Sequence, residues 1–238
     1  MKNIVGTGSR GLAAGAMVCF AAIWIDVSHG GPLSTAGRAL AGMLVRHRNP
    51  TLDRIMVLVT MLGDSFFLFP ALFVVLAFFS YKSEKSVTGR IAAHALLLYL
   101  TVHLVKVVSA IPRPHQFYGG PAHWAFPSGH AAMAFFFYGL LVRLCGDTRY
   151  RVRRLLSVSA ATLLIIIIGF SRVYLGAHWP GDVLAGYCLG LAALVSLPLV
   201  RERETGLPWH HLCLFLLVLL LFVHWLTHFS SNIQRYLL

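Results

Sequence analysis

A polar stretch between two long apolar segments contains the residues best suited to chemistry. It covers residues 171–182, and its Asp182 is the only acidic residue between Asp147 and Glu202. Asp182 follows His178 by four residues. A carboxylate that holds one imidazole nitrogen fixes the tautomer and frees the other nitrogen to attack an electrophile. We therefore predict that His178 is a nucleophile oriented by Asp182.

Three cationic side chains in separate parts of the chain could bind a phosphate group. Lys106, Arg113 and Pro114 follow one apolar segment in the pattern K-x6-R-P, and Arg172 precedes His178 by six residues. Arginine binds phosphate oxygens through two parallel donors, whereas lysine acts as a point charge. Such cations stabilise the charge that develops on the phosphoryl oxygens, which is usually the largest catalytic contribution.

The tetrapeptide Pro127-Ser128-Gly129-His130 stands directly before another apolar segment. Ser128 is suited to cap a helix, and the free N–H groups at a helix start attract anions. Gly129 would let the backbone approach a phosphate closely. We predict that His130 protonates the leaving oxygen and then activates the water that completes hydrolysis.

Composition places these groups in a membrane protein. The chain has 238 residues, of which 58% are hydrophobic and 12% charged, whereas soluble domains average about 25% charged residues. Several apolar segments reach the roughly 17 to 25 residues that a helix needs to cross a bilayer. The formal net charge of +12 does not indicate a nucleic-acid partner, because the basic residues lie in short loops between apolar segments. We predict one all-α integral membrane domain over residues 1–238.

The predicted architecture is a polytopic helical bundle with an amphipathic surface helix over residues 33–49. This amphipathic segment either covers the bundle or controls access of the substrate. The basic residues of the loops place the N-terminus in the cytoplasm and the C-terminus outside. Seven membrane spans are expected, at residues 11–28, 64–81, 91–109, 130–146, 155–172, 182–200 and 209–229.

This alternation brings the three motifs together. The span ends that carry them all emerge on the same, outer side of the membrane. Ionisable groups gathered beside hydrocarbon are costly and indicate a functional site. The combination of three cations, two histidines and one carboxylate predicts phosphoryl transfer from a lipid.

The three motifs resemble those of the type 2 phosphatidic acid phosphatase superfamily, membrane lipid phosphatases related to the vanadium haloperoxidases and the class A bacterial acid phosphatases. The resemblance covers about residues 60–200 and implies a core of six spans. The hydrophobic segment 209–229 is an additional span that this core does not require. It also implies metal-independent hydrolysis of a lipid phosphate or pyrophosphate through a phosphohistidine, without a cofactor. The implied catalytic residues are His178, His130 and Asp182, the implied phosphate ligands are Lys106, Arg113, Ser128, Gly129 and Arg172, and the motif-supporting residues are Pro114, Pro127 and Ser171.

Other chemistries fit the sequence less well. Residues Cys145 to Arg151 match the C-x5-R pattern of cysteine phosphatases, but they are expected on the opposite membrane face. A two-metal phosphatase needs several clustered carboxylates, and the motif face offers Asp182 with Asp64 as the second candidate. A vanadate-dependent peroxidase shares the anion cage, but membrane embedding favours a lipid substrate. A lipid head-group transporter or binding protein would need the cations but neither His178 nor Asp182.

The sequence does not name the lipid. The family resemblance favours undecaprenyl pyrophosphate, because small single-domain members are typically bacterial; phosphatidylglycerophosphate, phosphatidic acid and the 1-phosphate of lipid A are alternatives. The aromatic loop from His115 to Phe126 is either an interfacial belt or a specificity element. The expected location is the bacterial inner membrane with the site on its extracytoplasmic face. No metal, cofactor or nucleic-acid partner is expected, and the oligomeric state is left open.

Overall fold

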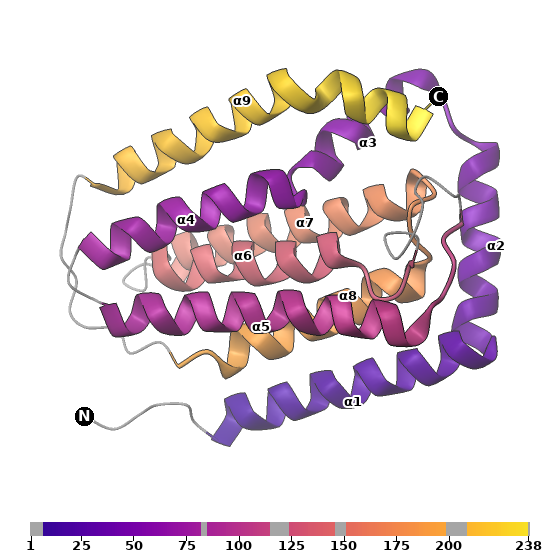
Figure 1. Ribbon diagram of the computed structural model, residues 1–238, viewed down its shortest axis with the longest axis horizontal. Coiled ribbons are helices and arrows are strands. Elements are labelled where there is room, and N and C mark those ends of the chain that lie inside the picture. The colour runs from indigo at the N-terminus through magenta and orange to yellow at the C-terminus, as the bar shows by residue number, and fades with distance from the viewer. Residues whose placement is uncertain (1–6, 82–84, 115–123, 146–150, 199–208, 238) are drawn as a thin grey trace.

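Helices make up the regular structure of the part of the chain that the structure describes. The computed structural model describes residues 7–81, 85–114, 124–145, 151–198 and 209–237 (Figure 1). Its helices are α1 (Thr7–His29), α2 (Pro32–Arg46), α3 (Pro50–Met61), α4 (Ser65–Tyr81), α5 (Lys85–Ser109), α6 (Gly129–Cys145), α7 (Arg151–Tyr174), α8 (Pro180–Ser196) and α9 (Trp209–Leu237). The all-α prediction is confirmed.

The long helices are apolar enough to lie in a bilayer. Five helical segments of the described residues have the length and composition to cross a membrane, namely Gly8–His29, Pro50–Phe78, Lys85–Ser109, Arg151–Tyr174 and Leu216–Leu237. Helices α6 and α8 are shorter apolar helices. They pack against each other, and α8 also packs along α1. The buried core between the helices includes Ile91, Phe136, Leu140 and Ala185.

The helix ends that carry the motifs lie at one end of the bundle. Helices α5 and α7 finish there, and helices α6 and α8 begin there (Figure 1). The prediction that these four ends share one side of the molecule is therefore confirmed. The later part of α9, the helix that follows the six expected core spans, reaches the same end (Figure 1).

Helix α2 crosses this end of the bundle, where an amphipathic helix was predicted (Figure 1). The carboxylate of Asp26 accepts hydrogen bonds from the backbone N–H groups of Leu33 and Ser34, at 3.2 and 2.8 Å, and so fixes the start of α2. A Cβ atom at Gly37 would lie 3.2 Å from Cδ of Pro180. Helix α2 therefore packs directly against the start of α8, with little space between them.

Helix α3 is absent from the spans expected from the sequence. It starts after Asn49, whose side chain accepts a hydrogen bond from the N–H of Leu52 at 2.8 Å, and Pro50 occupies its first position. Asparagine followed by proline is a helix-start signal. This signal divides the predicted amphipathic segment 33–49 from a further helix, which lies against α7 and α9.

Glycines in α8 allow it to approach the start of α6 closely. A Cβ atom at Gly186 would lie 2.5 Å from the backbone oxygen of Ser128, and one at Gly190 would lie 2.6 Å from that of Ala132. A backbone oxygen cannot give way unless helix α6 itself shifts. Small residues are the usual means by which membrane helices come this close. This contact sets the position of the Ser128 segment relative to α8.

We expect Gly186→Ala to destabilise the protein by about 1 to 3 kcal/mol, because the added methyl group overpacks the contact between α6 and α8. The matched control is Gly89→Ala in α5, where a Cβ atom would meet no other atom within 4 Å. Thermal unfolding in detergent should give a lower Tm for Gly186→Ala and an unchanged or higher Tm for the control. Equal Tm values for the two variants would contradict the close approach of these helices.

Candidate active site

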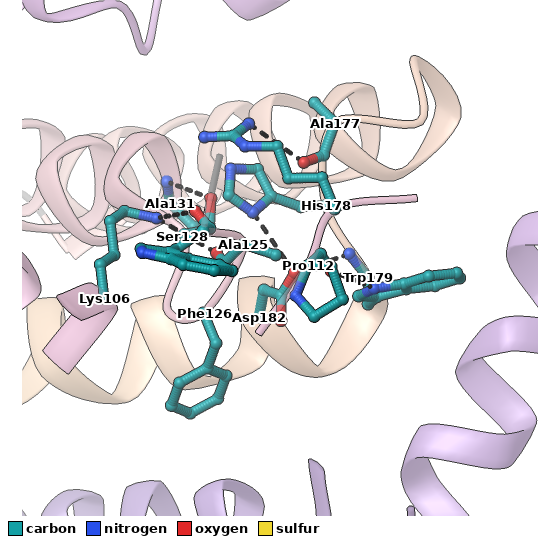
Figure 2. A network of polar contacts seen from close by, with 12 residues as sticks. Lys106, Pro112, Ala125, Phe126, Ser128, Ala131, Ala177, His178, Trp179 and Asp182 are labelled. Atoms are coloured by element: carbon teal, nitrogen blue, oxygen red, sulfur yellow. Dashed lines mark hydrogen bonds and ion pairs between the residues drawn. The ribbon is translucent and has the colours of Figure 1, made fainter. Parts of the chain in front are cut away.

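His178 and Asp182 form a buried pair where α7 gives way to α8. Nδ1 of His178 lies 3.4 Å from Oδ2 of Asp182, and the two side chains are 2% and 0% exposed (Figure 2). The same Oδ2 accepts a hydrogen bond of 2.8 Å from the backbone N–H of Trp179, which fixes the carboxylate. Because Nδ1 is directed at the carboxylate, Nε2 is the nitrogen left for a substrate. The spacing of four residues thus places the two side chains in contact.

The backbone turn before α8 positions His178. Helix α7 ends at Tyr174, and Gly176 follows with φ of 70°, a left-handed conformation that glycine adopts readily at helix ends. The N–H groups of Ala177 and His178 both donate to the backbone oxygen of Arg172, at 3.0 and 3.2 Å. The histidine is therefore held at a closed turn, two residues before Pro180, where the next helix starts.

The surroundings of His178 favour a neutral imidazole. Burial lowers the pKa of His178 well below its ordinary value, and the positive charges of Arg113, Lys106 and Arg172 lower it further. A neutral ring at neutral pH keeps the lone pair that a nucleophile needs. The same cations create a positive potential that attracts an anionic substrate.

Lys106 and Arg113 hold the loops around the histidine. Nζ of Lys106 donates to the backbone oxygens of Trp124 and Ala125, at 3.0 and 3.2 Å (Figure 2). Nη1 of Arg113 donates to the backbone oxygen of Ala177 at 3.1 Å. The two predicted phosphate ligands therefore also position backbone segments on both sides of the candidate site.

The start of α6 is tied to α8 by its backbone. The N–H of Ser128 donates to the backbone oxygen of Asp182 at 2.9 Å, and its Oγ accepts from the N–H of Ala131 at 3.4 Å. The second contact is that of a helix N-cap. A Cβ atom at Gly129 would lie 3.6 Å from Cγ1 of Val102, an ordinary contact, so packing within the protein does not itself demand glycine there.

His130 lies in the first turn of α6 and is half-buried. A Cβ atom at Gly63 would lie 3.4 Å from Cδ2 of His130, so the imidazole packs beside the turn that joins α3 to α4. His130 interacts electrostatically with His178 and with Arg172. The predicted acid–base residue therefore lies in the same electrostatic cluster as the predicted nucleophile.

Arg172 has two partners that no motif contains. Its Nη1 donates to Oγ1 of Thr60 at 2.7 Å and to the hydroxyl of Tyr236 at 2.8 Å. The guanidinium is fully enclosed, since the residue is 1% exposed. Thr60 belongs to α3 and Tyr236 to α9. A polar residue within an apolar segment was the one sequence signal for Thr60, and no pattern marked Tyr236.

The motif-supporting residues have structural positions. Ser171 is buried, and its Oγ donates to the backbone oxygen of Ile168 at 2.6 Å within α7. Pro127 is buried and follows Phe126 through a cis peptide bond. Pro114 is partly exposed. Ser171 thus bonds within its own helix.

Two predicted features fall largely outside the described residues. Residues 115–123 make up most of the aromatic loop, and residues 146–150 make up most of the C-x5-R pattern. The described part of the aromatic loop includes Trp124, whose backbone oxygen contacts Lys106 as given above. In the described parts of the chain, no three His, Cys, Asp or Glu side chains form a group that could hold a metal ion.

Comparison with known proteins identifies the family. The PAP2 superfamily matches residues 88–206. The chain is similar to phosphatidylglycerophosphatase B of Bacillus subtilis, with 30% identity over 177 residues that cover 68% of this chain and 82% of the relative. It is also similar to an undecaprenyl-diphosphatase of Sulfolobus acidocaldarius, with 26% identity over 163 residues, or 66% of this chain and 73% of the relative.

A solved structure shares the fold. It is the crystal structure of a transmembrane PAP2 type phosphatidylglycerolphosphate phosphatase from Bacillus subtilis, with a TM-score of 0.70 and 23% identity. The match covers 80% of this chain and 98% of the other. The family match, the relatives and the shared helical fold lead to one conclusion: the chain belongs to the PAP2 superfamily and is an integral membrane phosphatase of the PAP2 type.

Proposed function

We propose that the protein hydrolyses the terminal phosphate of a lipid phosphate or pyrophosphate through a phosphohistidine at His178, without a metal ion. The observation that carries the proposal is the buried contact of 3.4 Å between Nδ1 of His178 and Asp182. The contact leaves Nε2 to attack phosphorus and gives the ring an anionic partner when phosphorylation makes it positive. A protein that only binds or transports a lipid head group would need the cations but not this pair.

In the first step, Nε2 of His178 forms a bond to phosphorus while the bond from phosphorus to the leaving oxygen breaks. His130 gives its proton to that oxygen, so the lipid alcohol or lipid phosphate leaves as a neutral or less charged group. Lys106, Arg113 and Arg172 stabilise the charge on the remaining phosphoryl oxygens.

In the second step, water releases the phosphate. The now neutral His130 takes a proton from the water, the water oxygen bonds to phosphorus, and the bond from phosphorus to Nε2 breaks. The electron pair of that bond returns to the imidazole of His178. Both histidines regain their starting protonation states, and inorganic phosphate leaves.

The start of α6 is proposed to bind the phosphoryl oxygens through its backbone. The first N–H groups of a helix have no partner within that helix and carry the positive end of its dipole. The capping contact at Ser128 and the room for a Cβ atom at Gly129 support this role. Because packing tolerates a side chain at residue 129, close approach of a phosphate is the remaining physical reason for glycine.

The proposed substrate is undecaprenyl pyrophosphate. Of the two relatives described above, one is a phosphatidylglycerophosphatase and the other an undecaprenyl-diphosphatase. Both names describe removal of a phosphate from a lipid. Because one relative is a phosphatidylglycerophosphatase, phosphatidylglycerophosphate is the first alternative substrate, followed by phosphatidic acid and the 1-phosphate of lipid A. The basic residues of the loops support a bacterial inner membrane orientation with the N-terminus in the cytoplasm and the site outside. We treat residues 1–238 as one domain with its catalytic core at about residues 60–200.

We expect His178→Ala to lower phosphate release by at least about 10³-fold, because the variant has no nucleophile. The measurement is phosphate release from the four lipids named above, in buffer that contains EDTA because no proposed step uses a metal ion. The matched control is His94→Ala, which removes a histidine whose Nδ1 contacts only its own helix, at the backbone oxygen of Arg90. Turnover by His178→Ala at the rate of the control would contradict the phosphohistidine route.

Two substitutions of Asp182 separate its role in orienting the His178 ring from its role in stabilising the fold. We expect Asp182→Asn to lower kcat by about 10²-fold or more, because the anion that orients and stabilises the imidazolium is lost. Its amide oxygen can still accept the hydrogen bond from Trp179. Asp182→Ala loses that bond as well, so its stability should fall by about a further 1 kcal/mol. Thermal unfolding and turnover measured together check both expectations, and wild-type kcat in Asp182→Asn would contradict the role given to Asp182.

A further inference from the structure

The guanidinium of Arg172 donates hydrogen bonds to two residues that lie outside the family motifs. Thr60 and Tyr236 accept its two Nη1 hydrogen bonds, and both lie outside residues 88–206, the part of the chain that matches the family. The Cζ atom of Arg172 also lies 5.2 Å from the ring centroid of Tyr236. Tyr236 therefore contacts Arg172 through both its ring face and its hydroxyl.

These two partners are themselves rigidly placed. Tyr236 is 5% exposed and belongs to a buried cluster with Met56, Val57 and Met61 of α3. Helix α3 lies against both α7, which carries Arg172, and α9, which carries Tyr236. The position of the tyrosine hydroxyl is thus fixed by packing between helices and not by the path of a loop.

The pattern of hydrogen bonds leaves one edge of Arg172 for a ligand. A guanidinium has five N–H donors, of which Nη1 carries two, and both of these are used by Thr60 and Tyr236. Nε is buried and has no hydrogen-bond acceptor among the residues that the structure describes. A buried donor without an acceptor is costly, and the edge formed by Nε and Nη2 has the geometry that binds two oxygens of one phosphate.

We propose that Tyr236 of α9, together with Thr60, is a positioning residue that holds Nη1 of Arg172 so that its Nε edge faces the phosphate. This inference rests on the proposed function, since it concerns the same phosphate site. Arginine is a long and flexible side chain, and fixing it before the substrate binds removes an entropy cost from both binding and the transition state. Helix α9 thereby becomes part of the phosphate site.

Tyr236→Phe tests the proposal because it removes the hydroxyl and keeps the ring. The full-length variant should show a kcat/KM about tenfold lower and a Ki for inorganic phosphate about tenfold higher than wild type, as expected for loss of a hydrogen bond to a charged group. The matched control is Tyr187→Phe, which loses a hydroxyl bond of 2.7 Å to the backbone oxygen of Ile165. The control should lose stability to a similar degree and keep the wild-type Ki.

A second measurement needs no turnover. Inorganic phosphate should raise the Tm of wild type and of Tyr187→Phe, and it should raise that of Tyr236→Phe less at the same concentration. Thr60→Val should weaken phosphate binding as well, and the double variant should lose more than the two single variants combined, because each single variant keeps one acceptor.

The outcomes separate this inference from the proposed function. Tyr236→Phe with the wild-type Ki and the wild-type Tm response to phosphate would overturn the positioning role, even if kcat fell. Faster turnover in Tyr236→Phe would also overturn it, since the hydroxyl would then restrain Arg172 away from the substrate. Failure of the wild-type protein to release phosphate from any lipid, with a normal Tm response to phosphate, would instead contradict the proposed function.

Discussion

The hydrogen bond of 2.9 Å from the N–H of Ser128 to the backbone oxygen of Asp182 joins the two halves of the candidate site. One half is the start of α6, with its free N–H groups, and the other is the turn that carries His178. The bond can form because Gly186 and Gly190 let α8 lie against the backbone of α6. Without that close approach, the start of α6 and His178 would be separated, and the proposed phosphate site would be divided.

Positive charge dominates the region that this contact creates. Burial lowers the pKa of His178 and keeps its imidazole neutral, and the positive charges of Arg113, Lys106 and Arg172 add to this effect. Cations and free N–H groups gathered at one end of a membrane bundle require an anion to balance them. A terminal phosphate on a lipid meets this requirement, because its charged group can reach the site while its chains stay in the hydrocarbon.

Much of this arrangement could be predicted from the sequence, because a helix that crosses a membrane has only two sides on which to end. The alternation of apolar segments therefore predicts that the Lys106, Ser128 and His178 motifs lie on the same side. The spacing between His178 and Asp182 likewise predicted their contact, since both belong to one short turn. These predictions depend on short-range spacing and on the alternation of spans across the membrane, and both can be obtained from a single sequence.

Contacts between distant segments could not be predicted in the same way. Thr60 and Tyr236 meet at Arg172 although 112 and 64 residues separate them from it, and no spacing rule relates such positions. Helix α3 was missed because it has only 12 residues, including the charged Asp53 and Arg54, and so is shorter and more polar than the apolar run of roughly 17 to 25 residues that marks a membrane span. The bonds of Lys106 and Arg113 to backbone oxygens also depend on the path of loops, which residue types do not specify.

The central claim is that a phosphoryl group passes through His178. The most direct measurement mixes the protein with a lipid pyrophosphate that is labelled in its terminal phosphate, quenches within the first turnover under alkaline conditions, and maps the label by mass spectrometry. We predict that the label is found on His178, that it disappears as inorganic phosphate forms, and that Asp182→Asn forms it more slowly. Label on another residue, or phosphate release at full rate with no labelled protein, would contradict the account.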